Sequence, residues 1–204
     1  MKSSNILLFT GDSITCADRE AGKNELGKGY VNIINEELKR EKYKYKVVNR
    51  GCDGFRVTDL VRFWEEDCIK INPYTVTVLI GVNEVLNRFE GRDIIDRAAY
   101  YDYYNILLKE TSEKTNARII LIEPFIFPFP QRLADAQPYI YEEILAVRDL
   151  AKKYHTGYIY IESIFAKAVL KYGYRNLTTD GVHLTTFGHK IIAEEWLKEF
   201  KGLF

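Results

Sequence analysis

Residues 6–15 read ILLFTGDSIT, and this stretch decides the predicted fold. Its first four residues are apolar and Gly11 follows shortly after, which is typical of a short strand buried on both faces. The polar pair Asp12 and Ser13 comes directly after this predicted strand. Because ligands of open parallel sheets bind beyond the carboxyl ends of the strands, we expect Ser13 to lie at a binding edge.

The rest of the chain alternates between strand-like and helix-like patterns. Further strands are predicted at residues 46–49, 75–80, 118–122 and 157–161, and helices at residues 30–41, 58–69, 94–113, 139–154, 163–172 and 187–200. Strands that alternate with helices imply right-handed crossovers and therefore a parallel sheet. The sequence predicts an α/β fold, a three-layer αβα sandwich around a five-stranded parallel sheet, with residues 1–204 forming one domain.

The composition argues against several classes of protein. Of the 204 residues, 29 are Lys or Arg and 29 are Asp or Glu, so the formal net charge is zero. A nucleic-acid-binding protein normally has a basic surplus, so no nucleic-acid partner is expected. No apolar run approaches the roughly 18 residues of a membrane span, and the run at residues 6–9 is too short for a signal-peptide core. We therefore expect a cytoplasmic protein without membrane contact.

The cysteines Cys16, Cys52 and Cys68 show no CxxC spacing, and an odd number cannot all pair internally. We therefore expect buried thiols, without a disulfide framework or a structural zinc site. A thiol nucleophile at Cys16 or Cys52 is a poor alternative, because no histidine is local to either residue. The acidic residues and histidines match no metal-hydrolase spacing, so neither a metal nor another cofactor is expected.

Residues suited to acyl transfer follow the other predicted strands. Gly51 follows the second strand, Asn83 follows the third, and Asp180 and His183 precede the last helix. A serine can attack a carbonyl, a histidine can accept its proton and an aspartate can hold the imidazole tautomer. A backbone N–H and an amide side chain can stabilise the resulting oxyanion. These residue types at strand ends therefore favour an acyl-transfer site.

Four sequence blocks, in this order, resemble the SGNH hydrolase superfamily, also called the GDSL family of esterases and lipases. The blocks are Gly11-Asp12-Ser13, Gly51, Gly81-Val82-Asn83 and Asp180-Gly181-Val182-His183. Residues 11–15, 29–31 and 62–67 further resemble the small bacterial acetyl-xylan esterases and related carbohydrate deacetylases. The resemblance implies a flavodoxin-like SGNH hydrolase fold. The sequence contains no GxSxG elbow, which argues against the α/β-hydrolase fold.

The resemblance assigns a role to each matching residue. Ser13 is expected to be the nucleophile, His183 the general base and then the general acid, and Asp180 the residue that orients the imidazole. The expected oxyanion hole consists of the Ser13 N–H, the Gly51 N–H and the Asn83 side-chain amide.

Glu84 is a departure from the family pattern, because the third block usually reads Gly-x-Asn-Asp. We expect its extra methylene to alter the hydrogen bonds around Asn83 and to leave the triad unaffected. His189, in the run that opens the last predicted helix, is predicted to be structural.

The resemblance implies a serine esterase that hydrolyses short-chain acyl esters, acetyl esters in particular, on a carbohydrate and through an acyl-enzyme. Two alternatives stay open: a lysophospholipase or thioesterase-type SGNH lipase, and a non-catalytic flavodoxin-like binding domain. Asp12, Trp64 and Phe127 are the predicted substrate contacts, and the Pro- and Phe-rich residues 123–138 are a predicted pocket wall. A homo-oligomer is expected, because the 15 Tyr and 11 Phe supply aromatic surface and the acetyl-xylan esterases are often oligomeric.

Overall fold

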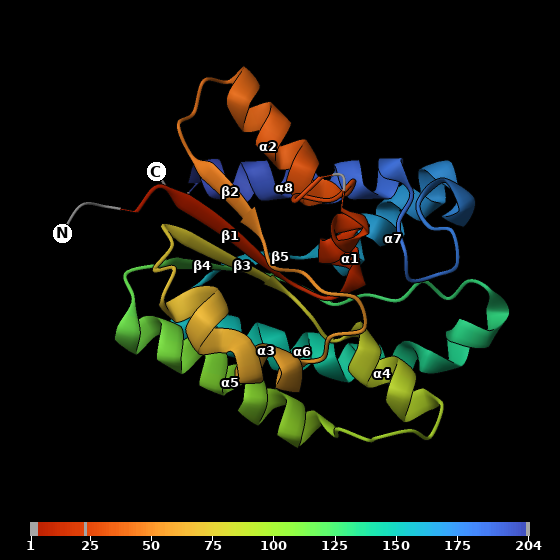
Figure 1. The fold of residues 1–204 in the computed structure, drawn as a ribbon. Helices are drawn as coiled ribbons and strands as arrows, with labels where there is room; N and C mark the ends of the chain where they lie inside the picture. Colours follow the sequence, from red (N-terminus) through yellow and green to blue (C-terminus); the bar gives the residue numbers. More distant parts are fainter. Residues whose placement is uncertain (1–3, 23, 203–204) are drawn as a thin grey trace.

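The computed structural model describes residues 4–22 and 24–202, which contain an open twisted sheet (Figure 1). Within these residues, the strands lie in the order β2-β1-β3-β4-β5, and every neighbouring pair is parallel. The strands are β1 (Ile6–Gly11), β2 (Lys46–Asn49), β3 (Thr75–Leu79), β4 (Arg118–Ile122) and β5 (Gly157–Ile159). The order is that of flavodoxin-like folds, and helices lie on both faces, so the predicted α/β sandwich is confirmed.

The helices form the outer two layers of the sandwich. They are α1 (Ser13–Cys16), α2 (Tyr30–Arg40), α3 (Val57–Trp64), α4 (Val82–Phe89), α5 (Arg97–Lys114), α6 (Gln137–Tyr154), α7 (Ile161–Tyr172) and α8 (Thr186–Gly202). In Figure 1, α2 and α8 lie on one face of the sheet, and α3, α5 and α6 lie on the other. The short α1 lies at the carboxyl end of β1, at the edge of the sheet where ligands of this fold class bind.

The apolar residues of the strands supply both cores, because successive side chains of a strand point to opposite faces. Leu7 and Phe9 belong to the cluster under α2 and α8, whereas Leu8 belongs to the cluster under α3 and α5. Each core contains a fully buried tryptophan whose indole N–H is satisfied. Trp196 donates to Thr77 Oγ1 at 2.8 Å, and Trp64 donates to Thr111 Oγ1 at 3.0 Å.

The observed elements differ from the predicted ones at three places. The helix expected at residues 58–69 changes into a π-helical turn, Glu65–Ile69, after Trp64. The third-strand block opens helix α4 directly, so Asn83 and Glu84 lie in its first turn. Residues 123–138, predicted as a pocket wall, contain the 3-10 turn Gln131–Ala136 and the start of α6. Pro138 lies in the first turn of α6, where a missing N–H is tolerated.

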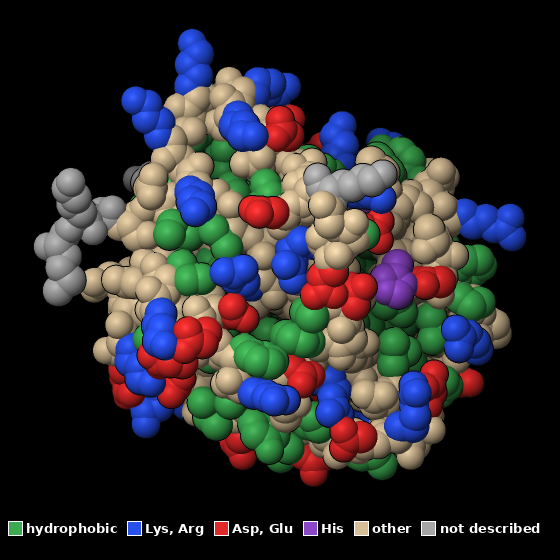
Figure 2. Space-filling model, in the orientation of Figure 1, with side chains coloured by type: hydrophobic (Ala, Val, Ile, Leu, Met, Phe, Trp, Pro, Cys, Tyr) green, Lys and Arg blue, Asp and Glu red, His purple; other side chains and the backbone are tan. Residues whose placement is uncertain are grey.

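The described residues contain no helix with both the length and the apolar character needed to cross a membrane. Figure 2 shows that basic and acidic side chains are interspersed over the face it displays.

Candidate active site

A hydrogen-bonded chain of three side chains lies beyond the carboxyl end of β1. Ser13 Oγ lies 3.0 Å from His183 Nε2, although the residues are 170 positions apart in the sequence. His183 Nδ1 lies 2.7 Å from Asp180 Oδ2. The carboxylate is an acceptor, so Nδ1 carries the ring proton and Nε2 of the neutral ring accepts from the Ser13 hydroxyl. The structure therefore brings together the three residues predicted as a triad.

The turn that carries Asp180 holds the carboxylate in place. Asp180 Oδ1 accepts from the N–H groups of Val182 and His183 at 2.9 and 2.8 Å, which leaves Oδ2 for the imidazole. Partial burial raises the pKa of Asp180, but the hydrogen bonds from the His183 ring and from the two N–H groups outweigh it and lower the pKa overall. Asp180 therefore stays ionised and fixes the tautomer of His183.

Asp12 holds the turn that presents Ser13. It is the N-cap of α1, and its Oδ1 accepts from the Ile14 N–H at 2.9 Å. Ser13 is the first residue of this helix, where a backbone N–H has no partner within the helix. The Ser13 N–H is therefore free to donate to a substrate oxygen placed beside Oγ.

Asn83 and Glu84 fix the segment that faces them across the site. Asn83 Nδ2 donates one of its two hydrogens to the Phe55 carbonyl at 2.8 Å, so the other hydrogen remains available. Glu84 is fully buried, and its Oε1 accepts from the Val57 N–H at the start of α3. The extra methylene of Glu84 thus serves a contact with α3, in line with the expectation that it affects the surroundings of Asn83 and not the triad.

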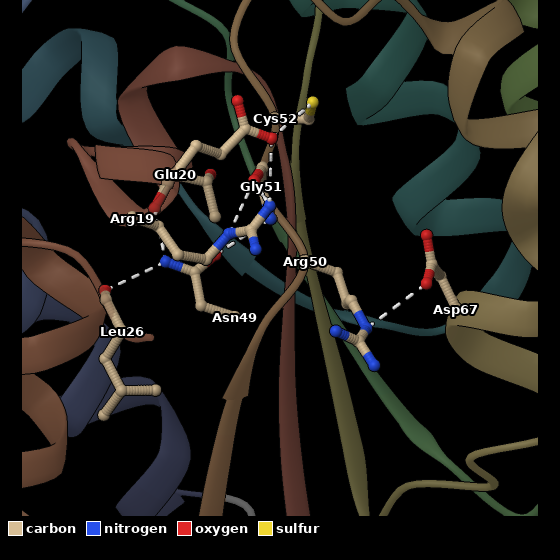
Figure 3. Close-up of polar contacts among 9 residues, drawn as sticks. Arg19, Glu20, Leu26, Asn49, Arg50, Gly51, Cys52 and Asp67 are labelled. Carbon is tan, nitrogen blue, oxygen red and sulfur yellow. Dashed lines mark hydrogen bonds and ion pairs between the residues drawn. The ribbon is translucent and has the colours of Figure 1, made fainter. Parts of the chain in front are cut away.

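Both backbone polar groups of Gly51, its N–H and its carbonyl, are hydrogen-bonded within the protein (Figure 3). Its N–H donates to Asn49 Oδ1 at 2.8 Å, and its carbonyl accepts from Arg19 Nε and Nη2 at 3.0 and 2.8 Å. A Cβ at this position would lie 2.4 Å from the Cys16 backbone nitrogen, so the close approach of the chains requires glycine. The Gly51 N–H, predicted as an oxyanion donor, therefore already has an acceptor within the protein.

Asn49 links the Gly51 backbone to the helix turn that carries Ser13. It is 3% exposed, and its Nδ2 donates to the carbonyls of Thr15 and Leu26 at 2.8 and 2.9 Å. All three of its hydrogen bonds go to backbone groups: those of Thr15 in α1, Leu26 in the segment before α2, and Gly51 after β2. One buried amide thus fixes the relative position of the Ser13 turn and Gly51.

A cavity of about 390 Å³ opens beside Ser13 and His183. The other lining residues are Ile14, Ala17, Asp18, Lys28, Asp53, Leu184, Thr186 and His189. Most of the groups opposite Ser13 are polar or charged, and Lys28 Nζ forms an ion pair with Asp18 Oδ2 at 3.1 Å. The lining includes neither Gly51 nor Asn83, so the cavity extends away from the predicted oxyanion donors.

None of the three predicted substrate contacts borders the cavity beside Ser13. Asp12 is 1% exposed and acts as the cap described above, and Trp64 is 1% exposed in the core against α5. Phe127 is also buried, packs on Phe165 and Tyr174, and lines a separate apolar cavity of about 330 Å³ that Ser13 does not touch. Large aromatic side chains gain most when they leave water, and that effect places Trp64 and Phe127 in the interior.

Sequence reasoning missed the residues that line the cavity. Asp18, Lys28 and Asp53 lie in loops. Their positions in the sequence do not indicate a binding site, because charged loop residues are common. The position of His189 shortly after His183 could have indicated a residue near the triad, although the sequence pattern predicts a structural role for it. It is buried and lines the cavity together with Ser13.

The surroundings of the cysteines disfavour the thiolate form. Cys16, Cys52 and Cys68 are free, and Cys52 Sγ donates to Glu20 Oε1 at 3.0 Å. Burial together with Glu20 raises the pKa of Cys52 to about 12, and burial raises that of Cys16. Cys16, Glu20 and Asp53 bring three possible ligand atoms within 4.8 Å of one another, but two of these residues are exposed acids of a kind common on protein surfaces.

The sequence matches the GDSL-like Lipase/Acylhydrolase family over residues 9–191. The chain belongs to this family. It is an esterase, as the family and its relatives indicate. The predicted resemblance to the GDSL esterases is thereby confirmed.

The relatives include an acetylxylan esterase from Geobacillus stearothermophilus, which is 30% identical over 97% of this chain and 94% of its own. The structure of the acetylxylan esterase Axe2 from that organism superimposes with a TM-score of 0.82 at 29% identity, covering 98% of this chain and 96% of its own. A GDSL-like lipase from Parabacteroides merdae gives a TM-score of 0.89 at 30% identity, covering 98% and 97%.

Proposed function

We propose that this esterase removes acetyl groups from a carbohydrate, with Ser13, His183 and Asp180 as its catalytic triad. The observation that carries the proposal is the hydrogen-bonded chain from Ser13 Oγ through His183 to the Asp180 carboxylate, with distances of 3.0 and 2.7 Å. The order and geometry of these contacts are those that a hydroxyl nucleophile requires.

In the first half of the reaction, Ser13 Oγ attacks the ester carbonyl carbon while its proton passes to His183 Nε2. Asp180 stays ionised beside Nδ1–H and stabilises the imidazolium that forms. His183 then gives the proton to the departing alcohol oxygen as the carbon–oxygen bond breaks. In the second half, a water molecule attacks the acetyl-Ser13 ester, and His183 moves the proton in the same way.

The oxyanion of the tetrahedral intermediate needs donors on the side of Ser13 opposite the departing alcohol. We propose the Ser13 N–H and the free hydrogen of Asn83 Nδ2 as the principal donors. The Gly51 N–H would donate to the oxyanion in a bond shared with Asn49, its acceptor in this structure.

The substrate class is argued from the cavity beside the triad. The charged and polar side chains of Asp18, Lys28, Asp53 and His189 offer hydrogen-bond partners to the hydroxyl groups of a carbohydrate. The name of the Geobacillus relative, an acetylxylan esterase, points to the same class of substrate. The apolar cavity lined by Phe127 does not contact Ser13, so it supplies no acyl-chain site to support the lipase alternative.

The test compares purified wild-type protein with Ser13→Ala on 4-nitrophenyl acetate, butyrate and octanoate, and on acetylated xylo-oligosaccharides. We expect wild-type turnover to be fastest with acetyl esters, and Ser13→Ala to lower it at least about 10⁴-fold. Ser163→Ala, which removes an exposed hydroxyl on α7, is the matched control and should keep the wild-type rate. Wild-type rates in Ser13→Ala would refute the triad, and a preference for octanoate would refute the acetyl substrate.

We further propose that the protein is cytoplasmic and forms a homo-oligomer through the face made by α6 and α7. Leu170, Tyr141 and Tyr160 are 88, 53 and 54% exposed there, next to the apolar cavity. Light scattering after gel filtration should report an oligomer for the wild type and a smaller species for Leu170→Lys. A monomeric wild type would refute the assembly.

A further inference from the structure

His189 lies in the first turns of α8 and closes one side of the cavity beside the triad. Its side chain lines that cavity together with Ser13 and His183, yet the residue is only 8% exposed. The Tyr30 N–H donates to His189 Nδ1 at 3.3 Å. Because Tyr30 is the first residue of α2, this N–H is one of the donors that a helix cannot satisfy internally.

This contact decides which ring nitrogen of His189 carries the proton. A nitrogen that accepts from a backbone N–H has no proton of its own, so the neutral ring must carry its proton on Nε2. Burial, with a smaller contribution from the nearby His183, lowers the pKa of His189 to about 4. At neutral pH the ring is therefore an uncharged hydrogen-bond donor through Nε2–H.

The ring is also held rigidly. A Cβ on Gly29 would lie 2.8 Å from His189 Cε1 and 3.0 Å from Nδ1, so the absence of a side chain at Gly29 makes room for this edge of the imidazole. Tyr30 stacks near the ring, with centroids 6.3 Å apart and planes 21° apart. With Nδ1 used by Tyr30, Nε2 is the remaining polar atom of a ring that borders the cavity, and it has no protein partner among the described residues.

The position of the cavity indicates which half of the substrate it receives. The departing alcohol takes its proton from His183 Nε2, so its oxygen must lie next to that atom. The cavity borders His183 and Ser13 and leaves out Gly51 and Asn83, which are the expected side for the carbonyl oxygen. The cavity is therefore the place of the alcohol, not of the acyl group.

We propose that His189 is a substrate-binding residue whose Nε2–H, fixed by the Tyr30 N–H on Nδ1, donates to an oxygen of the alcohol half of the ester. The inference rests on the proposed function, because a carbohydrate supplies such oxygens beyond the ester linkage. Asp18, Lys28, Asp53 and His183 are the other charged or ionisable side chains around the cavity. Among them, His189 is the one whose ring orientation is fixed by a backbone N–H, that of Tyr30.

The first measurement is the tautomer of His189 by long-range ¹H–¹⁵N correlation of the wild-type protein at pH 7. We expect a neutral ring protonated at Nε2. A charged ring, or a neutral ring protonated at Nδ1, would overturn the inference.

The second measurement compares kcat/KM for acetylated xylo-oligosaccharides with kcat/KM for phenyl acetate, whose leaving group has no further hydroxyl. His189→Phe should lower the ratio of the two about 3- to 10-fold, the size expected for one neutral hydrogen bond. His189→Gln, whose amide N–H can reach a similar place, should restore most of the ratio. His155→Phe, which removes an exposed imidazole at the end of α6, is the matched control and should leave the ratio unchanged.

The outcomes separate the inference from the proposed function. If the wild type hydrolyses both esters and His189→Phe changes them equally or not at all, His189 is structural and the inference is wrong. If the wild type does not hydrolyse acetylated xylo-oligosaccharides, the proposed function fails and the inference fails with it.

Discussion

We predict that the buried carboxyl group of Asp12 lowers the stability of this protein as the pH rises. Asp12 is 1% exposed, and its Oδ2 has no hydrogen-bond partner among the described residues. Burial, together with the nearby Glu84 and against the opposing effect of the Ile14 N–H, raises the pKa of Asp12 to about 8. The perturbation that tests this is Asp12→Asn, which keeps an oxygen to accept from Ile14 but cannot ionise.

The free energy of unfolding should fall with rising pH because the folded state binds more protons than the unfolded state. The folded pKa is raised above the unfolded value of about 3.9, so the stabilisation is fully present below pH 4 and is lost as the pH rises through about 8. Between pH 5.5 and 6.5 the folded state binds one more proton at Asp12 than the unfolded state. The free energy of unfolding should therefore fall by about 1.4 kcal/mol per pH unit from this group alone. Glu84 and Glu143, whose pKa values burial raises to about 7 and about 8, add slopes of the same sign.

The assay is urea unfolding at pH 5.5, 6.0 and 6.5 for the wild type and Asp12→Asn. The slope of the free energy of unfolding against pH should be less negative in Asp12→Asn by about 1.4 kcal/mol per pH unit. Asp102→Asn, which changes an exposed carboxylate on α5, should keep the wild-type slope. Equal slopes in wild type and Asp12→Asn would refute the reasoning, because Asp12 would then be ionised in the folded protein.

Further predictions concern the chemistry of the site. Asp180→Asn should lower kcat on 4-nitrophenyl acetate on the order of 10³- to 10⁴-fold, because the imidazole loses the group that sets its tautomer; a kcat near the wild-type value would contradict this. Asn83→Ala should lower kcat on the order of 10²- to 10³-fold with a smaller change in KM, and an effect confined to KM would exclude an oxyanion role. Iodoacetamide at pH 7.5 should leave the initial esterase rate unchanged, because burial and Glu20 raise the pKa of Cys52 to about 12; rapid inactivation would show a reactive thiolate.

The fold was predictable because each strand is a short apolar run that ends in a turn. Leu7, Leu8 and Phe9 are all fully buried, as their uninterrupted sequence predicted. The start of α4 was not predictable from the local pattern. Its N-cap, Gly81, has φ of +138°, and a Cβ there would lie 2.9 Å from both Pro124 Cβ and the Tyr100 hydroxyl. That helix start is set by packing against residues distant in the sequence.

The site residues that directly follow strands could be predicted, because the carboxyl ends of neighbouring parallel strands lie at the same edge of the sheet. Ser13 follows β1 and Asn83 follows β3, and these strands are direct neighbours in the sheet. The hydrogen bonds that Asn49 and Arg19 form with Gly51 could not be predicted, because nothing in the sequence near these two residues indicates a contact with Gly51. Trp64 was misplaced because residue type alone does not distinguish an aromatic wall of a pocket from an aromatic residue of the core.

The most direct test of the central claim is covalent labelling by an organophosphate such as diisopropyl fluorophosphate, followed by peptide mass spectrometry. The adjacent imidazole should activate a single hydroxyl, so we predict one phosphoryl group per chain, carried by the peptide that contains Ser13 and lost in His183→Ala. Phosphorylation of another residue, or an active protein that takes up no label, would contradict the account.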